Sequence, residues 1–341
     1  MAPIERKQPL LSICIPIYNR IAFLERQLER MLEDRFLFEE QIQLIISDNC
    51  STDNLQSCCE KYQALGLALK YHRQVTNIGP DGNFEWCFYH ADGKYVWLLG
   101  SDDILVRGVL KKLVMYLADD EYGLVHLSMN KQLHELTVFQ SPNDMAVAVN
   151  YWITYMSANI IRTASLVKVV LSEYKDSFLI QVPAYLNACC SYQRNALICF
   201  PLYFEKDADN ANNGGYNLFQ VFVANLYGIF EMFVNRGLLS QESFEKVIEV
   251  EYKGFLSRYI INLLIFRRYK NFNTEGALKI LWKYYGKKAY AYYYPVYFFI
   301  KQSAWHIIHF LLISIGVLTR CDCIKWFWFV WRKCKKQLFK N

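Results

Sequence analysis

The first 120 residues alternate short apolar runs with segments of helical spacing, and this alternation limits the folds open to the chain. Apolar runs predict strands at residues 10–19, 41–47, 67–75 and 94–100. Helices are predicted at 20–34, after Asp53, within 77–91 following a glycine and proline turn, and at 104–120. This order is typical of an α/β fold, in which helices cover a mainly parallel sheet and ligands bind beyond the carboxyl ends of the strands.

The remainder of the chain has a different pattern. Two shorter strands are predicted at 124–129 and 136–140, and a polar loop follows at 205–215. Beyond the loop, residues 216–237 and 243–269 predict long helices, the second amphipathic enough to pack on the first. We therefore expect two domains, an α/β domain over residues 1–215 and a helical domain, rich in aromatic and basic residues, over 216–341.

The composition indicates a folded protein. A hydrophobic content of 53% is ample for a core. The first residues carry charges and two prolines, unlike the apolar segment of a secretory signal, so we expect the protein to face the cytosol. The eleven cysteines are scattered, without a C-x-x-C pair or histidines at zinc spacing, and we expect most of them to be reduced, packed thiols.

Positive charge is concentrated at the carboxyl terminus. Residues 320–341 contain seven basic residues and one acid, which equals the net charge of +6 of the whole chain. The aromatic segment before them includes an uncharged run, 302–319, slightly shorter than the ~20 apolar residues of a spanning helix. Aromatic rings beside cations suit the headgroup layer, so we expect peripheral or monotopic attachment to an anionic membrane surface, with a soluble core helix as the alternative. Because no recognition motif accompanies the basic residues, nucleic acid is not an expected partner.

The first two predicted strands end in polar motifs. PIYNR, residues 16–20, lacks the glycines that dinucleotide folds need and the acid of an aspartyl phosphatase, so both classes are disfavoured. The second strand ends in SDNCSTD. There Asp48 could accept hydrogen bonds from a pyrimidine that stacks on Tyr18, or could serve only a turn and a helix cap.

Two further polar motifs follow the next strands. NIGPDGNF, residues 77–84, has glycines for a tight turn, and Asp81 or Asn83 could contact a ligand or cap the next helix. The run YVWLLG precedes Asp102 and Asp103, two carboxylates that would repel each other unless they are exposed or share a cation. Such oxygen ligands suit Mg²⁺ or Mn²⁺ together with substrate phosphates. The alternative, Asp103 as a helix N-cap, explains only one of the acids.

Taken together and in this order, PIYNR, SDNCSTD, NIGPDGNF and GSDD resemble the motifs of family 2 glycosyltransferases of the GT-A fold, in particular the abequosyltransferase-like sugar transferases of bacterial O-antigen synthesis. The resemblance is strong over residues 10–108 and fades toward residue 215. It implies transfer of a sugar from a nucleotide diphosphate donor, such as a CDP-3,6-dideoxyhexose, to a lipid-linked glycan at the cytoplasmic face of the inner membrane. It also implies Mg²⁺ or Mn²⁺ at the acid pair.

The resemblance implies which residues form the site. Those expected to line or border the nucleotide-sugar pocket are Pro16, Tyr18, Asn19, Arg20, Asp48, Asn77, Gly79, Asp81 and Asn83, and the expected metal ligands and catalytic acids are Asp102 and Asp103. The commoner D-x-D-D form of the last motif would have an acid at Gly100. Inverting members use a later carboxylate as base, for which Asp176, Glu205 and Asp207 are candidates, while a retaining reaction without such a base stays open.

Two other functions stay open. Gly100 and the unrecognised base would also suit a catalytically inactive GT-A-like scaffold in a membrane glycan-assembly complex. A nucleotidyltransferase likewise uses metal-binding carboxylates on an α/β sheet. It ordinarily has a loop rich in glycine, arginine or lysine after the first strand, and PIYNR is not such a loop.

Overall fold

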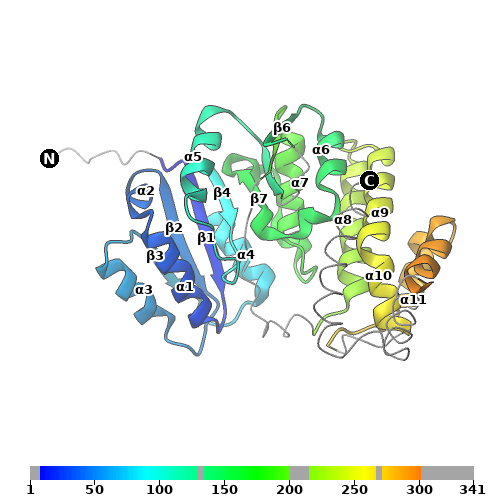
Figure 1. The fold of residues 1–341 in the computed structure, drawn as a ribbon, viewed down its shortest axis with the longest axis horizontal. Coiled ribbons are helices and arrows are strands. Elements are labelled where there is room, and N and C mark those ends of the chain that lie inside the picture. Colours follow the sequence, from blue (N-terminus) through cyan, green and yellow to red (C-terminus); the bar gives the residue numbers. More distant parts are fainter. Residues whose placement is uncertain (1–7, 129–133, 200–214, 266–270, 301–341) are drawn as a thin grey trace, which may run out of the picture. The chain divides into compact units, whose positions relative to one another are not determined.

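The computed structural model describes residues 8–128, 134–199, 215–265 and 271–300, and these residues include a sheet of eight strands (Figure 1). The order across the sheet is β3-β2-β1-β4-β7-β5-β8-β6. The strands are β1 (Leu11–Ile17), β2 (Ile42–Asp48), β3 (Lys70–Arg73), β4 (Tyr95–Leu98), β5 (Leu124–Ser128), β6 (Leu136–Phe139), β7 (Asn159–Arg162) and β8 (Asn195–Cys199). β1 to β4 run parallel, β7 is antiparallel to β4 and β5, β8 is parallel to β5, and β6 is antiparallel to β8. The predicted mainly parallel sheet is confirmed.

Helices cover both faces of the sheet. They are α1 (Ile21–Leu32), α2 (Arg35–Glu40), α3 (Leu55–Ala64), α4 (Gly79–Tyr89), α5 (Val109–Asp119), α6 (Pro142–Val149) and α7 (Gln181–Ser191). β1 is buried on both sides, which is why its sequence is apolar apart from Ser12, whose hydroxyl is hydrogen-bonded. Ile13 and Ile15 join the core that α1, α3 and α5 complete, whereas the Cys14 thiol donates to the Cys87 carbonyl of α4 at 3.6 Å. Replacing either isoleucine with alanine should cost about 2–5 kcal/mol of stability.

Some strands differ from the prediction. β3 has four residues, although the apolar run that predicted it spans 67–75. β7 and β8 were not predicted, because four or five residues are too few to establish a period. β7 follows two short 3₁₀ segments, Asn150–Thr154 and Met156–Ala158, and its antiparallel insertion next to β4 depends on contacts far apart in the sequence.

The region after residue 215 is helical, as predicted. Its helices are α8 (Leu226–Asn235), α9 (Gln241–Glu251), α10 (Ser257–Ile260) and α11 (Ala277–Tyr285), and π-helical turns precede α8 and flank α10. In the contacts of the described residues, α8 and α9 belong to one compact unit with the sheet, while Tyr252 begins a second unit. The functional division at residue 215 stays a prediction.

The predicted membrane segment lies mostly outside the part of the chain that the structure describes. Both the uncharged run 302–319 and the basic tail 320–341 fall there. Among the described residues, no helix has the combination of length and apolarity required to cross a bilayer.

Candidate active site

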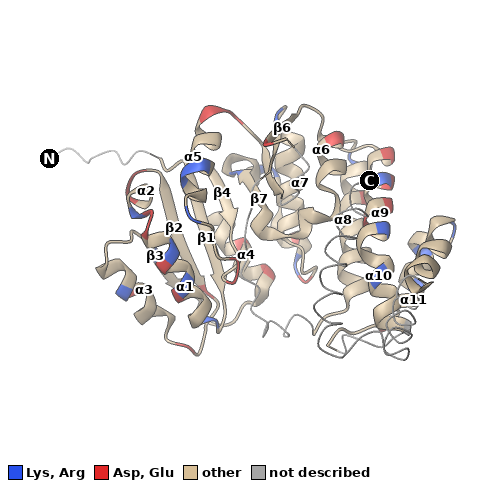
Figure 2. Cartoon of the chain, in the orientation of Figure 1, with Lys and Arg blue, Asp and Glu red and all other residues tan. Residues whose placement is uncertain are grey.

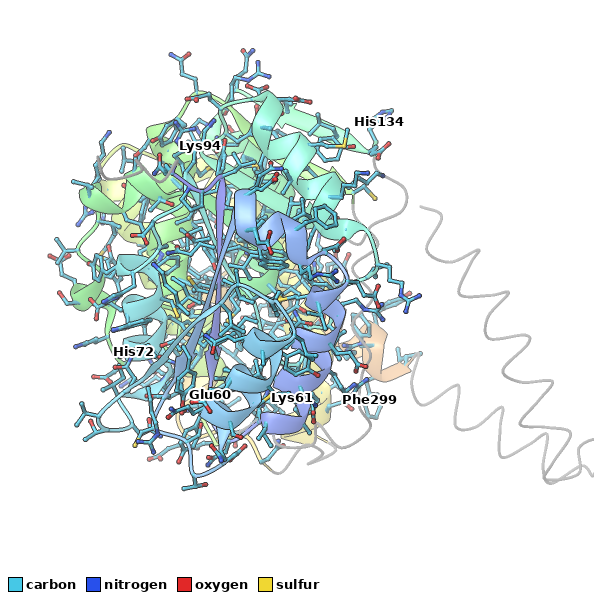
Figure 3. The ribbon with its side chains drawn as sticks, turned by 90° about the vertical axis from the view of Figure 1, so that its left-hand side faces the viewer. Glu60, Lys61, His72, Lys94, His134 and Phe299 are labelled. Carbon is cyan, nitrogen blue, oxygen red and sulfur yellow. The ribbon has the colours of Figure 1, made fainter. Side chains whose placement is uncertain are left out.

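The carboxyl ends of the parallel strands meet at one edge of the sheet. In the register, Pro16 lies opposite Ser47, and Asp48 lies between Ile17 and Arg73. Figure 3 gives the direction, because Lys94, directly before β4, and His72, near the end of β3, lie toward opposite ends of the sheet. β1 and β4 carry no charge along their length, so the charged groups of this part of the site come from the loops beyond the strands (Figure 2). Pro16 itself is buried within β1.

The turn between β1 and α1 is bonded to the turn after β2. Asn19 has a left-handed φ of 51°, its amide donates to the Ser51 hydroxyl at 2.9 Å, and its side-chain oxygen accepts from the Thr52 amide at 2.7 Å. Asp53 accepts from the first amide of α1 at 2.9 Å. Asn19 and the SDNCSTD turn therefore stabilise each other. This arrangement fixes the backbone position of Arg20, the residue directly before α1.

Asp48 is buried and fully engaged. One carboxylate oxygen accepts from the Ser51 amide at 2.8 Å, and the other accepts from the Tyr71 hydroxyl at 2.7 Å. Burial and this hydrogen bond raise the pKa of Tyr71. Arg73 Nε lies 3.6 Å from the second oxygen of Asp48, and its side chain is 47% exposed. Tyr18 is 44% exposed. Asp48 thus holds a half-exposed guanidinium at this edge of the sheet.

The NIGPDGNF motif forms a tight turn with buried anchors. Asn77 accepts from the Gly79 amide at 2.9 Å and from Asn49 Nδ2 at 3.0 Å, and Gly79 has the positive φ of 75° that favours glycine. Asn83 is buried and exchanges two hydrogen bonds with Ser47, so it ties α4 to β2. Capping of α4 by Asp81 or Asn83 is wrong, because both lie inside the helix and Ile78 occupies the N-cap position, while Asn77 accepts from the first amide of the helix.

Asp81 connects this motif to a distant loop. Its carboxylate accepts from the Phe178 amide at 2.9 Å. Burial raises the pKa of Asp81, and backbone amides of Phe178 and Ile180 offset part of that rise. The loop before α7 also contains Asp176, which is exposed and has a φ of 63°. Of the three base candidates, only Asp176 lies in the described part of the chain; Glu205 and Asp207 lie outside it.

The two adjacent acids have different environments. Asp102 is a partly exposed carboxylate whose Oδ2 lies 3.0 Å from Arg20 Nη1. Asp103 Oδ1 accepts from the Tyr155 hydroxyl at 2.7 Å, and its Oδ2 accepts from the Ser157 hydroxyl. The N-cap alternative for Asp103 is wrong, since α5 begins six residues later, after Gly108.

A side chain at Gly100 would crowd the two acids. A Cβ at this position would lie 2.7 Å from Asp103 Oδ2 and 3.2 Å from both Asp102 Oδ1 and the Ser157 oxygen. The Gly100 amide donates to the same Ser157 oxygen at 2.8 Å. Burial raises the pKa of Asp103 to about 6, although hydrogen bonds from Ser157 and Tyr155 lower it. The missing acid of the motif is therefore replaced by a turn that packs two hydroxyls against Asp103.

Asp102 and Asp103 suit a metal site completed by substrate phosphates better than a metal site made of protein side chains alone. The described residues contain no group of three or more histidine, cysteine or acidic side chains that could hold a metal. Mg²⁺ and Mn²⁺ commonly use one or two carboxylates with substrate phosphates. Asp102 fits as the direct ligand because it is partly exposed, and Asp103 has both oxygens in hydrogen bonds.

Four residues of this arrangement were not predicted. They are Tyr71, Arg73, Tyr155 and Ser157. Tyr71 and Arg73 stand in a predicted strand without a motif, and their position beside Asp48 follows only from strand pairing. Tyr155 and Ser157 stand more than 50 positions beyond Asp103. Tyr155 lies between two short 3₁₀ segments and Ser157 within the second, and neither segment has a sequence signature.

Curated relatives support the sequence motifs. Over 124 residues the chain is 38% identical to the abequosyltransferase RfbV of Salmonella typhimurium, a match that covers 36% of each chain. Over 118 residues it is 31% identical to a Campylobacter jejuni GalNAc(5)-diNAcBac-PP-undecaprenol β-1,3-glucosyltransferase, covering 34% of this chain and 37% of that one. The chain thus spans little more than a third of the length of these relatives.

Solved structures share the fold. Staphylococcus aureus TarS, residues 1–349, superposes with a TM-score of 0.56 at 17% identity and 75% coverage of both chains. A Pyrobaculum calidifontis mannosyltransferase, solved with GDP-Man and Mn²⁺, has a TM-score of 0.50 at 15% identity, covering 74% of this chain and 72% of that one. The predicted GT-A fold is confirmed by this likeness. The family model described as Glycosyl transferase family 2 matches residues 12–198, which make up more than half of this chain. The chain therefore belongs to glycosyl transferase family 2.

Proposed function

We propose that the chain transfers a sugar from a nucleotide diphosphate donor to a glycan acceptor during synthesis of a bacterial surface polysaccharide. The observation that carries this proposal is the placement of two sets of groups at one sheet edge. Asp48 and Arg73 form a set suited to a base, and Arg20 with Asp102 forms a set suited to a diphosphate and its cation. The names of the relatives, an abequosyltransferase and a β-1,3-glucosyltransferase, support a role of this kind.

The base would bind between Tyr18 and Arg73. The exposed Tyr18 ring offers a face for stacking. Arg73 spends one N–H donor on the Ser51 carbonyl at 2.9 Å, and other guanidinium donors can reach a pyrimidine carbonyl. Cytosine and uracil both carry the O2 carbonyl, so a CDP-3,6-dideoxyhexose and a UDP-sugar both suit this set. Asp48 is itself buried, so its role would be to keep the Arg73 guanidinium in place.

The diphosphate would bind beside Arg20 and Asp102. A guanidinium binds phosphate oxygens in bidentate fashion, so Arg20 can exchange its contact with Asp102 for one with the leaving diphosphate. Asp102 would then hold Mg²⁺ or Mn²⁺, with Asp103 supporting it from the adjacent position. When bound, the cation would neutralise the charge that develops on the departing diphosphate.

The acceptor would be deprotonated by a carboxylate beyond the donor pocket. We propose Asp176 for this role in an inverting reaction, because it is exposed and its loop is bonded to the donor-side residue Asp81. Asp207 and Glu205 remain candidates outside the described residues. A retaining reaction would need none of the three.

The acceptor class we propose is a lipid-linked saccharide at the cytoplasmic face of the inner membrane. In the described part of the second unit, residues 290–300 are helical, and Tyr293, Tyr297 and Ile300 are 52–59% exposed at the spacing of one helix face. Lys287 and Lys288 precede this helix. Such a face with neighbouring cations suits peripheral binding to an anionic membrane. Co-sedimentation with vesicles containing phosphatidylglycerol, but not with phosphatidylcholine vesicles, is the expected result.

A nucleotide screen tests the enzymatic proposal. Purified full-length protein is heated with UDP, CDP, GDP or dTDP, with and without Mn²⁺. A pyrimidine nucleoside diphosphate at 100 times its dissociation constant should add about 2.7 kcal/mol of stability, and Mn²⁺ should enhance the effect. Asp102→Ala should remove the Mn²⁺ enhancement and abolish hydrolysis of the corresponding nucleotide sugar. The exposed Asp119, at the end of α5, provides the matched control, Asp119→Ala.

The same assays separate the alternatives. An inactive GT-A-like scaffold would show no turnover of any nucleotide sugar. A nucleotidyltransferase would release pyrophosphate from a nucleoside triphosphate and a sugar phosphate, and would leave nucleotide sugars intact in the absence of pyrophosphate.

A further inference from the structure

The loop before α7 holds two residues in a conformation that L-amino acids rarely adopt. Asp176 has a φ of 63° and Phe178 a φ of 60°, and for a bulky residue such as phenylalanine this is a true outlier. Backbone strain of this kind persists only where surrounding contacts impose it, and it concentrates at ligand-binding sites. The imposing contacts are two hydrogen bonds to the peptide group that joins Ser177 and Phe178, between the two strained positions. Asp81 accepts from the Phe178 amide at 2.9 Å, and Asn225 donates to the Ser177 carbonyl at 2.9 Å.

This loop connects the two halves of the candidate active site. Through Asp81 it joins the NIGPDGNF turn, whose Gly79 carbonyl accepts from Asn49, the neighbour of Asp48, at 3.1 Å. On its other side, Gln181 donates to the Thr154 carbonyl at 3.0 Å. Thr154 directly precedes Tyr155, the residue that donates to Asp103. Hydrogen bonds of the loop and of the first residue of α7 thus lead to the NIGPDGNF turn on one side and to the segment that carries Tyr155 on the other.

The strained conformation displays an aromatic surface. The Phe178 ring is 47% exposed, and its centroid lies 5.8 Å from that of Tyr216 with the planes 31° apart. Tyr216 is braced in turn by Phe272, edge to face at 5.3 Å. A phenylalanine that served only the hydrophobic core would be buried, and this one is not. Its exposed face is two residues from the exposed carboxylate of Asp176.

We propose that Phe178, supported by Tyr216, is a stacking platform for a pyranose ring of the acceptor saccharide. Sugars present flat C–H faces that pack on aromatic rings, and ring-bound hydroxyls that carboxylates accept from, and the loop offers both groups. This inference rests on the proposed function and adds the acceptor subsite to it. A nucleobase is the less suitable occupant, because the polar groups that read a base edge are at Asp48 and Arg73, whereas the Phe178 neighbourhood offers ring faces.

The test uses full-length protein and three substitutions. Phe178→Asn removes the ring and suits the left-handed backbone, whereas Phe178→Tyr keeps the ring. Phe36→Asn removes a similarly exposed ring from α2, where Phe36 is 52% exposed, and serves as the control. Saturation-transfer NMR measures contact between protein and two probes, methyl α-D-mannopyranoside and octyl β-D-galactopyranoside. The thermal shift produced by CDP and UDP is measured on the same samples.

Wild type, Phe178→Tyr and Phe36→Asn should transfer saturation to the sugar ring protons, and Phe178→Asn should lose it by about fivefold or more. Phe178→Asn should also melt at a higher temperature than wild type, since the strain is relieved. This combination of higher stability and lost sugar contact is not expected of a structural residue. The nucleotide shift should be equal in all four proteins.

Several results would overturn the platform. These are transfer that persists in Phe178→Asn, transfer that is lost equally in Phe36→Asn, no transfer to either sugar in wild type, or a lower melting temperature for Phe178→Asn. Loss of the nucleotide shift in Phe178→Asn would also overturn it, because the ring would then serve the donor. Absence of any nucleotide shift in wild type would count against the proposed function instead, while the sugar result would still decide the platform.

Discussion

Arg20 Nη1 lies 3.0 Å from Asp102 Oδ2, so the cation after β1 and the first acid after β4 form an ion pair across neighbouring strand ends. The two side chains are 34% and 25% exposed, and an ion pair of this kind contributes only about 0–1 kcal/mol to stability. The pair can therefore open at little cost when a diphosphate and its cation arrive. We therefore expect Arg20 to bind substrate rather than to stabilise the fold.

Replacing Arg20 should reduce activity without unfolding the protein. We expect Arg20→Gln to lower kcat/KM for donor turnover by about 100-fold, because one donor to the developing diphosphate charge is lost. The melting temperature should change little. Arg194→Gln is the matched control, since Arg194 also pairs with an acid, Asp120, but lies away from these strand ends. A large loss of stability in Arg20→Gln would contradict the substrate-binding role.

Gly100 should not accept any side chain. Gly100→Ala would force a Cβ within 2.7 Å of Asp103 Oδ2, so turnover that depends on Mn²⁺ should fall. Gly100→Asp restores the commoner motif. Its Mn²⁺-dependent turnover should be lower still, because the substitution adds a third carboxylate to the same space. Gly228→Ala is the control, since a Cβ there meets no atom within 4 Å. Higher activity in Gly100→Asp would show that the present packing of the acids is not the functional one.

The hydrogen bond from the Tyr155 hydroxyl to Asp103 should stabilise the folded protein. Tyr155→Phe removes one of the two hydroxyls that Asp103 accepts from, and a hydrogen bond to a charged group contributes about 1.5–3 kcal/mol. Urea unfolding should show a loss in this range. Tyr89→Phe, at a tyrosine that is 56% exposed, should show none. Equal stability of Tyr155→Phe and Tyr89→Phe in urea would show that the hydrogen bond from Tyr155 to Asp103 does not stabilise the fold.

His126 should make the protein less stable in mild acid. This histidine is buried on β5, its Nδ1 lies 2.9 Å from Asn159 Oδ1, and burial lowers its pKa to about 4. The unfolded chain binds a proton near pH 6.5 and the folded protein does not, so this contribution is present above pH 6.5 and is lost as the pH falls toward 4. The slope should be about 1.4 kcal/mol per pH unit. Denaturant unfolding should show a flatter profile for His126→Gln, and His72→Gln, at an exposed histidine, should keep the wild-type slope.

Glu251 should make the protein less stable as the pH rises, the opposite of the effect of His126. It is fully buried at the end of α9, and burial raises its pKa well above the ordinary value, an effect that the Tyr227 hydroxyl offsets only in part. The folded protein therefore holds a proton that the unfolded chain releases above about pH 4.5. The free energy of unfolding of the wild type therefore falls as the pH rises. Relative to wild type, Glu251→Gln should become more stable between pH 5 and pH 8. Glu242→Gln, at an exposed glutamate paired with Lys246, should show no such trend in melting temperature.

Much of the fold and part of the site could be predicted because they depend on local patterns. Ile13 and Ile15 stand in a nearly continuous apolar run that is typical of a parallel strand covered on both faces. Parallel strands bring their carboxyl ends to one edge, and Arg20, Asp48 and Asp102 therefore share that edge. Asn83 and Asn19 were expected at the ligand, but each is held by protein partners, which the motif alone does not reveal.

The sequence by itself determined the order of strands and helices and the polar residues that end the strands, because periodicity and turn chemistry act between near neighbours. The tertiary structure decided which partners those residues have. Tyr155 and Ser157 reach Asp103 only because β7 enters the sheet antiparallel beside β4, and Arg73 reaches Asp48 only through the pairing of β3 with β2. Such contacts join positions 25 to more than 50 residues apart, where no local preference acts, and packing of the whole sheet selects them.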